Sequence, residues 1–385
     1  MHKTEHKKLY YYKGVIEMEL LKKNYDFYKL DKILSKNALY NIIYGQRANG
    51  KSYAVKKWCI SESYLYDRYF TLCFRFKEDK KTNAKIASYF DDAPISKITK
   101  GEYDGIKVKS DILYFTYTDD KGKVKYGKQA GYVAFVDCEE QYKSLPFDKN
   151  YNIIYEEFIS RRMYIVDEVT KFQSLVSTLL RLRINEGTQC RVFLIGNLIS
   201  QVNPYRLEWN LNKLENQKPD TIDEYIFITQ TGQVKIAAER CKQVKSQGGI
   251  AVSKKAQQQE TGEWETAEVP IFNRDNMSNY YINHTFVYTY MGSYFLCRFL
   301  TEKNNTSSMF IYIEKKTTPI KDGTRVIGDI YDTSVLYTST FKPLVDRERI
   351  VFDLLKAGKV CFSDRLTGTN FYTCYNTMMK TKTLF

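Results

Sequence analysis

The chain has 385 residues, which corresponds to about two or three domains of ordinary size. Hydrophobic residues make up 43% and charged residues 27% of it, with 7 prolines and 19 glycines, so a collagen-like or proline-rich disordered protein is excluded. Lysine and arginine outnumber aspartate and glutamate by 59 to 45, and this net charge of +14 favours a polyanionic partner: nucleic acid, or less often an acidic membrane surface.

The sequence has no sign of export or of a metal site built from histidine and cysteine. Residues 1–12 contain no apolar run of the kind that directs export, and no segment reaches the roughly 18 uncharged apolar residues of a membrane span. The eight cysteines stand singly, so they predict neither a zinc site nor a disulfide framework. The histidines, His2, His6 and His284, give no basis for a metal site or a catalytic triad. We expect reduced thiols in a cytosolic setting and no membrane partner.

Apolar runs alternate with helical patterns through the first two-thirds of the chain. Strands are predicted at residues 38–44, 69–76, 112–117, 132–136, 152–155, 191–195 and 225–229. Residues 52–62 have a helical pattern, and so do residues 168–182, for which Asp167 is the expected N-cap. The DDKG turn at 119–122 makes the two strands around it a hairpin insertion. The alternation predicts an α/β fold with a mostly parallel sheet and helices on both faces.

The pattern changes in the last third of the chain. Residues 242–268 are rich in Lys, Gln, Gly and Ser and poor in large apolar residues, which is typical of a linker or mobile loop. From residue 283 onward alternating segments dominate, and a helix is predicted at 346–355. The predicted organisation is, in chain order, an N-terminal domain (1–235), a linker (236–275) and a smaller β-rich α+β domain (276–385).

The segment between the first strand and the first helix matches a phosphate-binding motif. Residues 45–52 read GQRANGKS, which fits G-x-x-x-x-G-K-[ST] in the strand-to-helix context that makes the match specific. The glycines permit a tight turn, so that loop N–H groups and the helix N-terminus can surround phosphate oxygens. Lys51 is expected to reach the β- and γ-phosphates of ATP, and Ser52 to supply a hydroxyl to Mg²⁺. The residues expected to contact the nucleotide are Gly45, Gln46, Arg47, Ala48, Asn49, Gly50, Lys51, Ser52 and Tyr53.

An ATPase of this kind needs two acids at the end of an apolar strand, one for the metal shell and one for the attacking water. Two segments qualify: MYIVDE at 163–168 and NIIYEE at 152–157. In the former, the helix would begin at the acid without a turn, and the two neighbouring strands would be too close for a parallel crossover. We therefore predict Glu157 as the catalytic glutamate and Glu156 as the metal-side acid, with Glu168 as the alternative.

Asn197 follows the predicted strand at 191–195. A side-chain amide at the end of such a strand can touch both the γ-phosphate and the attacking water, and so act as a sensor of the bound nucleotide. Asparagine is also common in turns, so the position of Asn197 alone does not decide between the two roles.

Four segments together resemble the DNA-packaging ATPases of small, protein-primed tailed phages, the φ29-like group. They are GQRANGKSY at 45–53, NIIYEEFI at 152–159, MYIVDEV with LVSTLLRLR within 163–183, and LIGNLISQVNPY at 194–205. They follow the family's order with similar gaps and span about the first 210 residues. The resemblance implies an ASCE-type P-loop domain that uses ATP and Mg²⁺. The family has aspartate where this chain has Glu156, so the chain departs from the family's pattern at the metal-side acid and carries a longer side chain there.

The resemblance also implies residues that act between subunits. The family assembles as a ring, expected to be a pentamer, on the portal of an empty capsid, and an arginine of one subunit completes the site of the next. Arg181 matches that arginine, and Arg183 ranks second because two residues further along a helix it faces elsewhere. Complementing the dipole at a helix C-terminus is the alternative role for both. Lys143 matches a family lysine that reaches a neighbouring site, and residues 203–224 match the lid segment beside the nucleotide.

The C-terminal domain resembles the vestigial RNase H-like domain of the same family. A working nuclease of that class needs several carboxylates that converge on two metal ions. The aspartates of this region do not form a convergent set on the predicted strands; they are Asp329, Asp332, Asp346 and Asp353. We therefore expect no nuclease activity.

These implications give an expected function, an ATP-driven motor that moves double-stranded DNA through the portal of a procapsid. A structural RNA as a further partner is left open. The basic stretch at 77–85 offers phosphate contacts for sequence-blind transport, namely Lys77, Lys80, Lys81 and Lys85. The expected location is the cytoplasm of the infected host, transiently at the portal vertex, and not the mature virion. The alternatives are a helicase-like nucleic-acid NTPase and a non-catalytic portal scaffold with an inactive P-loop.

Overall fold

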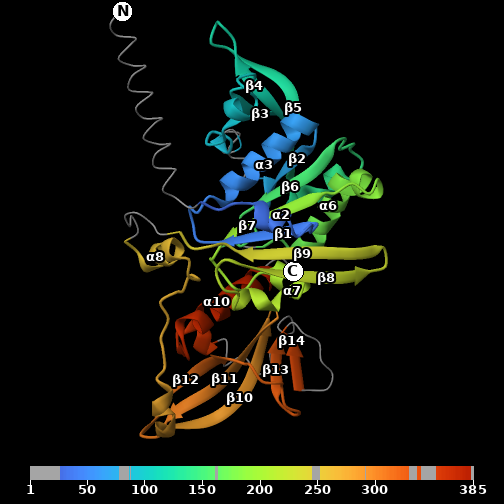
Figure 1. Cartoon of the computed structure of the whole chain (residues 1–385). Coiled ribbons are helices and arrows are strands. Elements are labelled where there is room, and N and C mark those ends of the chain that lie inside the picture. The colour runs from blue at the N-terminus through green and yellow to red at the C-terminus, as the bar shows by residue number, and fades with distance from the viewer. Residues whose placement is uncertain are drawn as a thin grey trace, which may run out of the picture.

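The computed structural model contains two β-sheets, each with helices packed against it (Figure 1). It describes residues 27–77, 86, 88–160, 164–244, 252–290, 292–328, 336–339 and 353–382. Several residues named above lie outside these ranges: Lys80, Lys81, Lys85, Asp329, Asp332 and Asp346, together with most of the helix predicted at 346–355. Within the described part of the chain, no helix is both long and apolar enough to cross a membrane.

The larger sheet has nine strands in the order β3-β4-β5-β2-β6-β7-β1-β9-β8. The strands are β1 (Tyr40–Gly45), β2 (Tyr69–Phe74), β3 (Gly105–Lys109), β4 (Ile112–Thr118), β5 (Val124–Phe135), β6 (Asn150–Glu156), β7 (Arg191–Asn197), β8 (Thr221–Thr229) and β9 (Gly232–Arg240). In this order the six central strands, β5-β2-β6-β7-β1-β9, pair in parallel. Antiparallel pairing adds β4 and β3 beside β5 at one edge and β8 beside β9 at the other. The prediction of a mostly parallel α/β sheet is confirmed.

Two long helices cover this sheet. In α3 (Lys51–Tyr66), Val55, Cys59 and Ile60 are buried, and in α6 (Glu168–Asn185) the predicted apolar stripe from Val169 to Leu180 is buried. Asp167 is the N-cap residue of α6, as predicted, but its backbone is in the left-handed region at φ 56° and its side chain makes no capping hydrogen bond. Burial of the apolar stripe, rather than a cap, therefore stabilises α6.

The remaining described helical segments are short or lie near the second sheet. They are α2 (Asp31–Leu34), α5 (Ile95–Ile98), η2 (Val136–Tyr142), α7 (Pro204–Glu208), η3 (Asn212–Glu215), α8 (Lys254–Thr261), η4 (Arg274–Asn279) and α10 (Arg365–Lys382). Helix α8 lies inside the predicted linker, and β9 continues the larger sheet past the predicted domain boundary at 235.

The smaller sheet has six strands in the order β14-β13-β10-β11-β12-β15. They are β10 (Tyr280–Tyr290), β11 (Ser293–Glu302), β12 (Asn305–Lys315), β13 (Arg325–Gly328), β14 (Leu336–Ser339) and β15 (Val360–Phe362). β10 to β12 form an antiparallel meander, and β13 and β14 add in parallel beside β10. Phe371 of α10 packs its ring against Tyr288, Phe295 and Phe362, and so closes the core of this domain.

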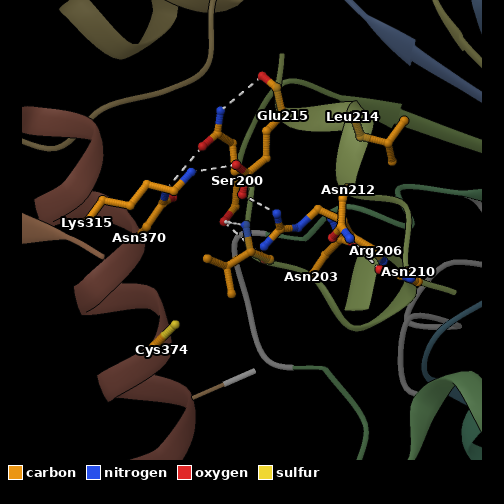
Figure 2. Close-up of polar contacts among 12 residues, drawn as sticks. Ser200, Asn203, Arg206, Asn210, Asn212, Leu214, Glu215, Lys315, Asn370 and Cys374 are labelled. Atoms are coloured by element: carbon orange, nitrogen blue, oxygen red, sulfur yellow. Dashed lines mark hydrogen bonds and ion pairs between the residues drawn. The ribbon is translucent and has the colours of Figure 1, made fainter. Parts of the chain in front are cut away.

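Side chains from both domains meet beside α7 and α10 (Figure 2). Glu215 accepts from the guanidinium of Arg206 and, at 2.6 Å, from the ammonium of Lys315 on β12. Asn370 of α10 donates to the side chain of Gln201 at 3.2 Å. The two domains are therefore joined by polar contacts as well as by the chain between them.

Candidate functional site

The 45–52 loop joins the carboxyl end of β1 to the N-terminus of α3. Gly50 has φ 89°, a backbone conformation that residues with a side chain rarely adopt. A Cβ at this position would lie 3.3 Å from the Phe27 ring. Ala48 is also left-handed, at φ 58°. Left-handed residues of this kind are typical of loops whose backbone N–H groups bind anions.

Lys51 is 5% exposed, although no acid forms an ion pair with it among the described residues. Its ammonium donates to Gln46 O at 2.6 Å, to Asn49 Oδ1 at 3.1 Å and to Asn197 Oδ1 at 3.3 Å. Burial lowers the pKa of Lys51, because the charged form loses water. A phosphate would supply the countercharge that this buried ammonium lacks. Asn197 lies beside the same ammonium, which donates to its Oδ1.

Glu156 ends β6 and faces the start of α3. Its carboxylate accepts from Ser52 Oγ at 3.1 Å and from the hydroxyl of Tyr89 at 2.6 Å. Burial raises the pKa of Glu156, and the two hydroxyl donors oppose that shift. Hard oxygen donors close together are the ligands that Mg²⁺ prefers, and this cation commonly takes only one or two protein ligands beside substrate phosphates. Ser52 and Glu156 therefore fit a Mg²⁺ ion.

Glu157 follows Glu156 directly but differs from it in surroundings. It is exposed, and its backbone is left-handed at φ 54°. Its backbone carbonyl accepts a hydrogen bond from Arg75 Nη1 at 3.2 Å. An exposed carboxylate with no hydrogen bond among the described residues can accept a proton from a water molecule.

One cavity of about 880 Å³ brings these residues together. It is lined by the end of β6, the end of β7, the 45–52 loop and the segment 27–31; from the predicted set it includes Arg47, Ala48, Asn49, Gly50, Lys51, Ser52, Tyr53, Glu156, Glu157 and Asn197. The alignment follows from the sheet, where Gly45 pairs with Asn197 and Glu156 pairs with Ile195. Gly45, Gln46 and the segment 203–224 do not line this cavity.

Glu168, the alternative acid, lies away from the cavity and is 1% exposed. It accepts from Arg75 Nε at 2.8 Å, from the hydroxyls of Tyr155 and Tyr205 at 2.9 and 3.0 Å, and from the N–H of Ile165. Glu168 is the acidic residue of the first turn of α6, and its carboxylate is also the centre of a buried network. The network leaves Glu168 no room to meet a water molecule.

The two arginines proposed to act between subunits differ in their contacts. Arg181 is exposed on the last turns of α6 and has no ion pair or hydrogen bond from its side chain within the described ranges. Arg183 pairs with Glu186 at 2.9 Å and lies over the ring of Tyr151. Contacts within the chain therefore hold the Arg183 side chain, whereas the Arg181 side chain is exposed and could contact a second subunit.

Besides Lys51, the structure describes two predicted lysines, and both lie outside the cavity. Lys143 is exposed and forms an ion pair with Glu140 at 3.3 Å. Lys77 is also exposed; its backbone N–H donates to Asp137 at 3.0 Å and its ammonium to Gln141 at 3.4 Å. Neither lysine belongs to the nucleotide-facing set.

Sequence reasoning missed three contributors to this site. Arg75 fixes the backbone after Glu156, and the signal for it is a single arginine inside the apolar run YFTLCFRF. Tyr89, which donates to Glu156, has no local signal. Phe27, which lines the cavity, belongs to a segment without a periodic pattern.

Comparison with known proteins adds independent findings. The family model described as podovirus DNA encapsidation protein (Gp16) matches residues 22–252. The DNA packaging proteins of Bacillus phage PZA and Bacillus phage phi29 are 29% identical to the chain over 204 residues, which is 52% of this chain and 55% of each relative. The chain spans about half the length of the curated relatives it matches. The solved bacteriophage phi-29 viral genome packaging motor assembly is similar in fold, with a TM-score of 0.54, 20% identity, and coverage of 91% of this chain and 99% of that one.

Proposed function

The chain belongs to the podovirus DNA encapsidation protein (Gp16) family, and we propose that it is an ATP-driven motor that moves double-stranded viral DNA through the portal into an empty procapsid. The observation that carries the proposal is the single cavity that gathers Lys51, Ser52, Glu156, Glu157 and Asn197. A triphosphate, a divalent cation and an attacking water are what this set of groups suits. The test is ATP turnover with and without double-stranded DNA.

The proposed chemistry assigns a separate role to each group. The 45–52 loop and Lys51 hold the phosphates, Asn197 contacts the γ-phosphate, and Glu157 takes the proton of the attacking water. Ser52 and Glu156 would hold Mg²⁺, which when bound neutralises charge that develops on the phosphate oxygens. Strand β7 lies between the strand of the loop and the strand of the acids, and this order supports an ASCE-type P-loop domain.

The Lys51→Ala variant is expected to lose turnover. Without the ammonium, the transferred phosphoryl group loses its closest fixed positive charge, which costs about 10²- to 10³-fold in kcat for a single preorganised donor. Steady-state ATPase assays check this. Lys97→Ala, at an exposed position on α5, is the matched control, and turnover by Lys51→Ala equal to that of Lys97→Ala would contradict the assignment.

DNA contact is proposed for the basic stretch that begins at Lys77. Each lysine that neutralises one phosphate contributes about 0.9 to the slope of log K against log salt for duplex DNA. If Lys77 contacts one phosphate, we expect Lys77→Ala to reduce the magnitude of that slope by about 0.9. Lys121→Ala, an exposed lysine in the turn between β4 and β5, controls for the lost charge. Equal slopes for the two variants would remove Lys77 from the DNA-binding set.

The C-terminal domain is proposed to be a vestigial RNase H-like domain. The meander of β10 to β12 with β13 and β14 in parallel beside β10 supports this fold. Its central strand β10 reads YYINHTFVYTY and contains no carboxylate, so no acid of that strand can bind the metal ions of a nuclease. We infer a structural or docking role for the domain rather than DNA cleavage.

Assembly and location follow from the same proposal. The site needs a cation from a second copy, so we infer a homo-oligomeric ring, with a pentamer as the stoichiometry to test by electron microscopy. The portal, and a structural RNA if one is present, are its proposed partners. The proposed location is the host cytoplasm and, transiently, the portal vertex.

A further inference from the structure

The side chain of Gln46 joins the 45–52 loop to the segment that connects the two sheets. Its Nε2 donates to Val244 O at 2.9 Å and to Glu260 O, and its Oε1 accepts from the N–H of Val244 at 2.8 Å. The residue is 5% exposed. We call these three hydrogen bonds the Gln46 clasp. All three bonds are made to backbone groups of the connecting segment, so the clasp fixes the backbone position of that segment at Val244 and Glu260.

The connecting segment, of which residues 241–244 and 252–267 are described, runs from the nucleotide side of the larger sheet to the C-terminal domain. The N–H of Glu265 donates to Leu198 O at 3.0 Å, one residue after Asn197. The N–H of Ala267 then donates to Thr369 Oγ1 of α10 at 2.8 Å. A shift of this segment at the loop would therefore reach α10.

Lys51 links the clasp to nucleotide binding. Its ammonium donates to the carbonyl oxygen of Gln46 at 2.6 Å, a charge-assisted hydrogen bond that fixes the Gln46 peptide. The same ammonium is the group assigned to the β- and γ-phosphates. A bound triphosphate competes for it, so the Gln46 carbonyl loses its partner when the phosphates gain theirs.

We propose that Gln46 is a positioning residue through which nucleotide occupancy of the 45–52 loop sets how firmly the connecting segment is held. The proposal rests on the proposed function, because ATP is taken as the ligand. With nucleotide bound, the Gln46 peptide is less restrained and the clasp opens more often. Linkage makes the effect reciprocal: opening the clasp must strengthen nucleotide binding by the factor by which nucleotide weakens the clasp.

Hydrogen exchange at the Val244 amide of the full-length chain tests this, with and without Mg²⁺ and a slowly hydrolysed ATP analogue. In the wild type we expect the analogue to speed exchange roughly fivefold or more, the lower end of ordinary coupling between sites. In Gln46→Ala the exchange should be fast in both conditions. Gln243→Ala is the matched control, because its Nε2 donates within the segment to Thr261 O at 2.9 Å and not to the loop; it should keep the response.

Val244→Pro is the second variant, since it removes the N–H from the clasp and leaves the loop sequence intact. By reciprocity it should bind the analogue about fivefold more tightly than the wild type. Three results overturn the proposal: unchanged or slower wild-type exchange with the analogue, equal exchange in Gln46→Ala and Gln243→Ala, or no gain in affinity in Val244→Pro. A wild type that binds no analogue overturns both the proposed function and the proposal that nucleotide controls the clasp. Even then, hydrogen exchange at Val244 in the variants without nucleotide still decides whether the clasp exists.

Discussion

The Glu157→Gln variant is expected to lower kcat for ATP hydrolysis by about 10²- to 10⁴-fold, the usual contribution of a positioned general base. Glutamine has nearly the same shape but cannot take a proton from water. Because Lys51 and the loop are unchanged, ATP binding should stay within about twofold of the wild type, so the loss falls on kcat alone. Steady-state turnover with double-stranded DNA and calorimetric binding of Mg·ATP separate the two quantities.

Glu168→Gln is the decisive comparison for this prediction. Its carboxylate pairs with Arg75 inside the protein, and removal of one partner from a buried ion pair costs about 3 to 5 kcal/mol of stability. We therefore expect a lower melting temperature and, because Arg75 also holds the Glu157 carbonyl, a loss of kcat per folded molecule well below that of Glu157→Gln. If Glu168→Gln abolishes turnover while Glu157→Gln keeps it, Glu157 is not the general base. A wild type without turnover would favour the non-catalytic scaffold, and duplex unwinding without any capsid would favour the helicase-like alternative.

The Arg181→Ala variant is expected to lose about 10³- to 10⁵-fold in kcat as a homo-oligomer, the range measured for arginine fingers. The physical reason is its place on α6. That helix begins at Glu168 near the carboxyl ends of the strands and runs back over the sheet, so Arg181 lies about 20 Å along the helix axis at 1.5 Å per residue. We therefore expect its guanidinium to act on the cavity of a neighbouring subunit rather than on that of its own.

Subunit mixing measures this directly. Arg181→Ala has an intact cavity, and Glu157→Gln has an intact arginine, so a mixture of the two should recover turnover where the second subunit serves the first. Arg183→Ala is the matched control, because Arg183 is held by Glu186 and Tyr151 of its own chain, and its homo-oligomer should keep most activity. An Arg183→Ala homo-oligomer that is inactive alone but regains turnover when mixed with Glu157→Gln, while Arg181→Ala stays active, would reassign the finger to Arg183.

Local patterns in the sequence determined several features of this protein. The loop at 45–52 was readable because its glycines, Lys51 and Ser52 are contiguous, and the strands and α6 were readable from apolar periodicity over a few residues. The choice of Glu157 over Glu168 was also made from spacing alone, and the cavity contains Glu157 and excludes Glu168.

Only the tertiary structure decided what depends on residues far apart in the chain. The strand order brings Asn197 level with Gly45, and the Arg75–Glu168 pair joins residues 93 positions apart. The Gln46 clasp spans 198 positions to Val244, and its glutamine reads from the sequence as one more loop residue. Periodicity reports which face of one element is apolar, whereas the partner of a buried polar group is set by the packing of several elements. The phosphate-binding motif could therefore be recognised in the sequence, whereas the residues that contact it and hold it in place could be identified only in the folded chain.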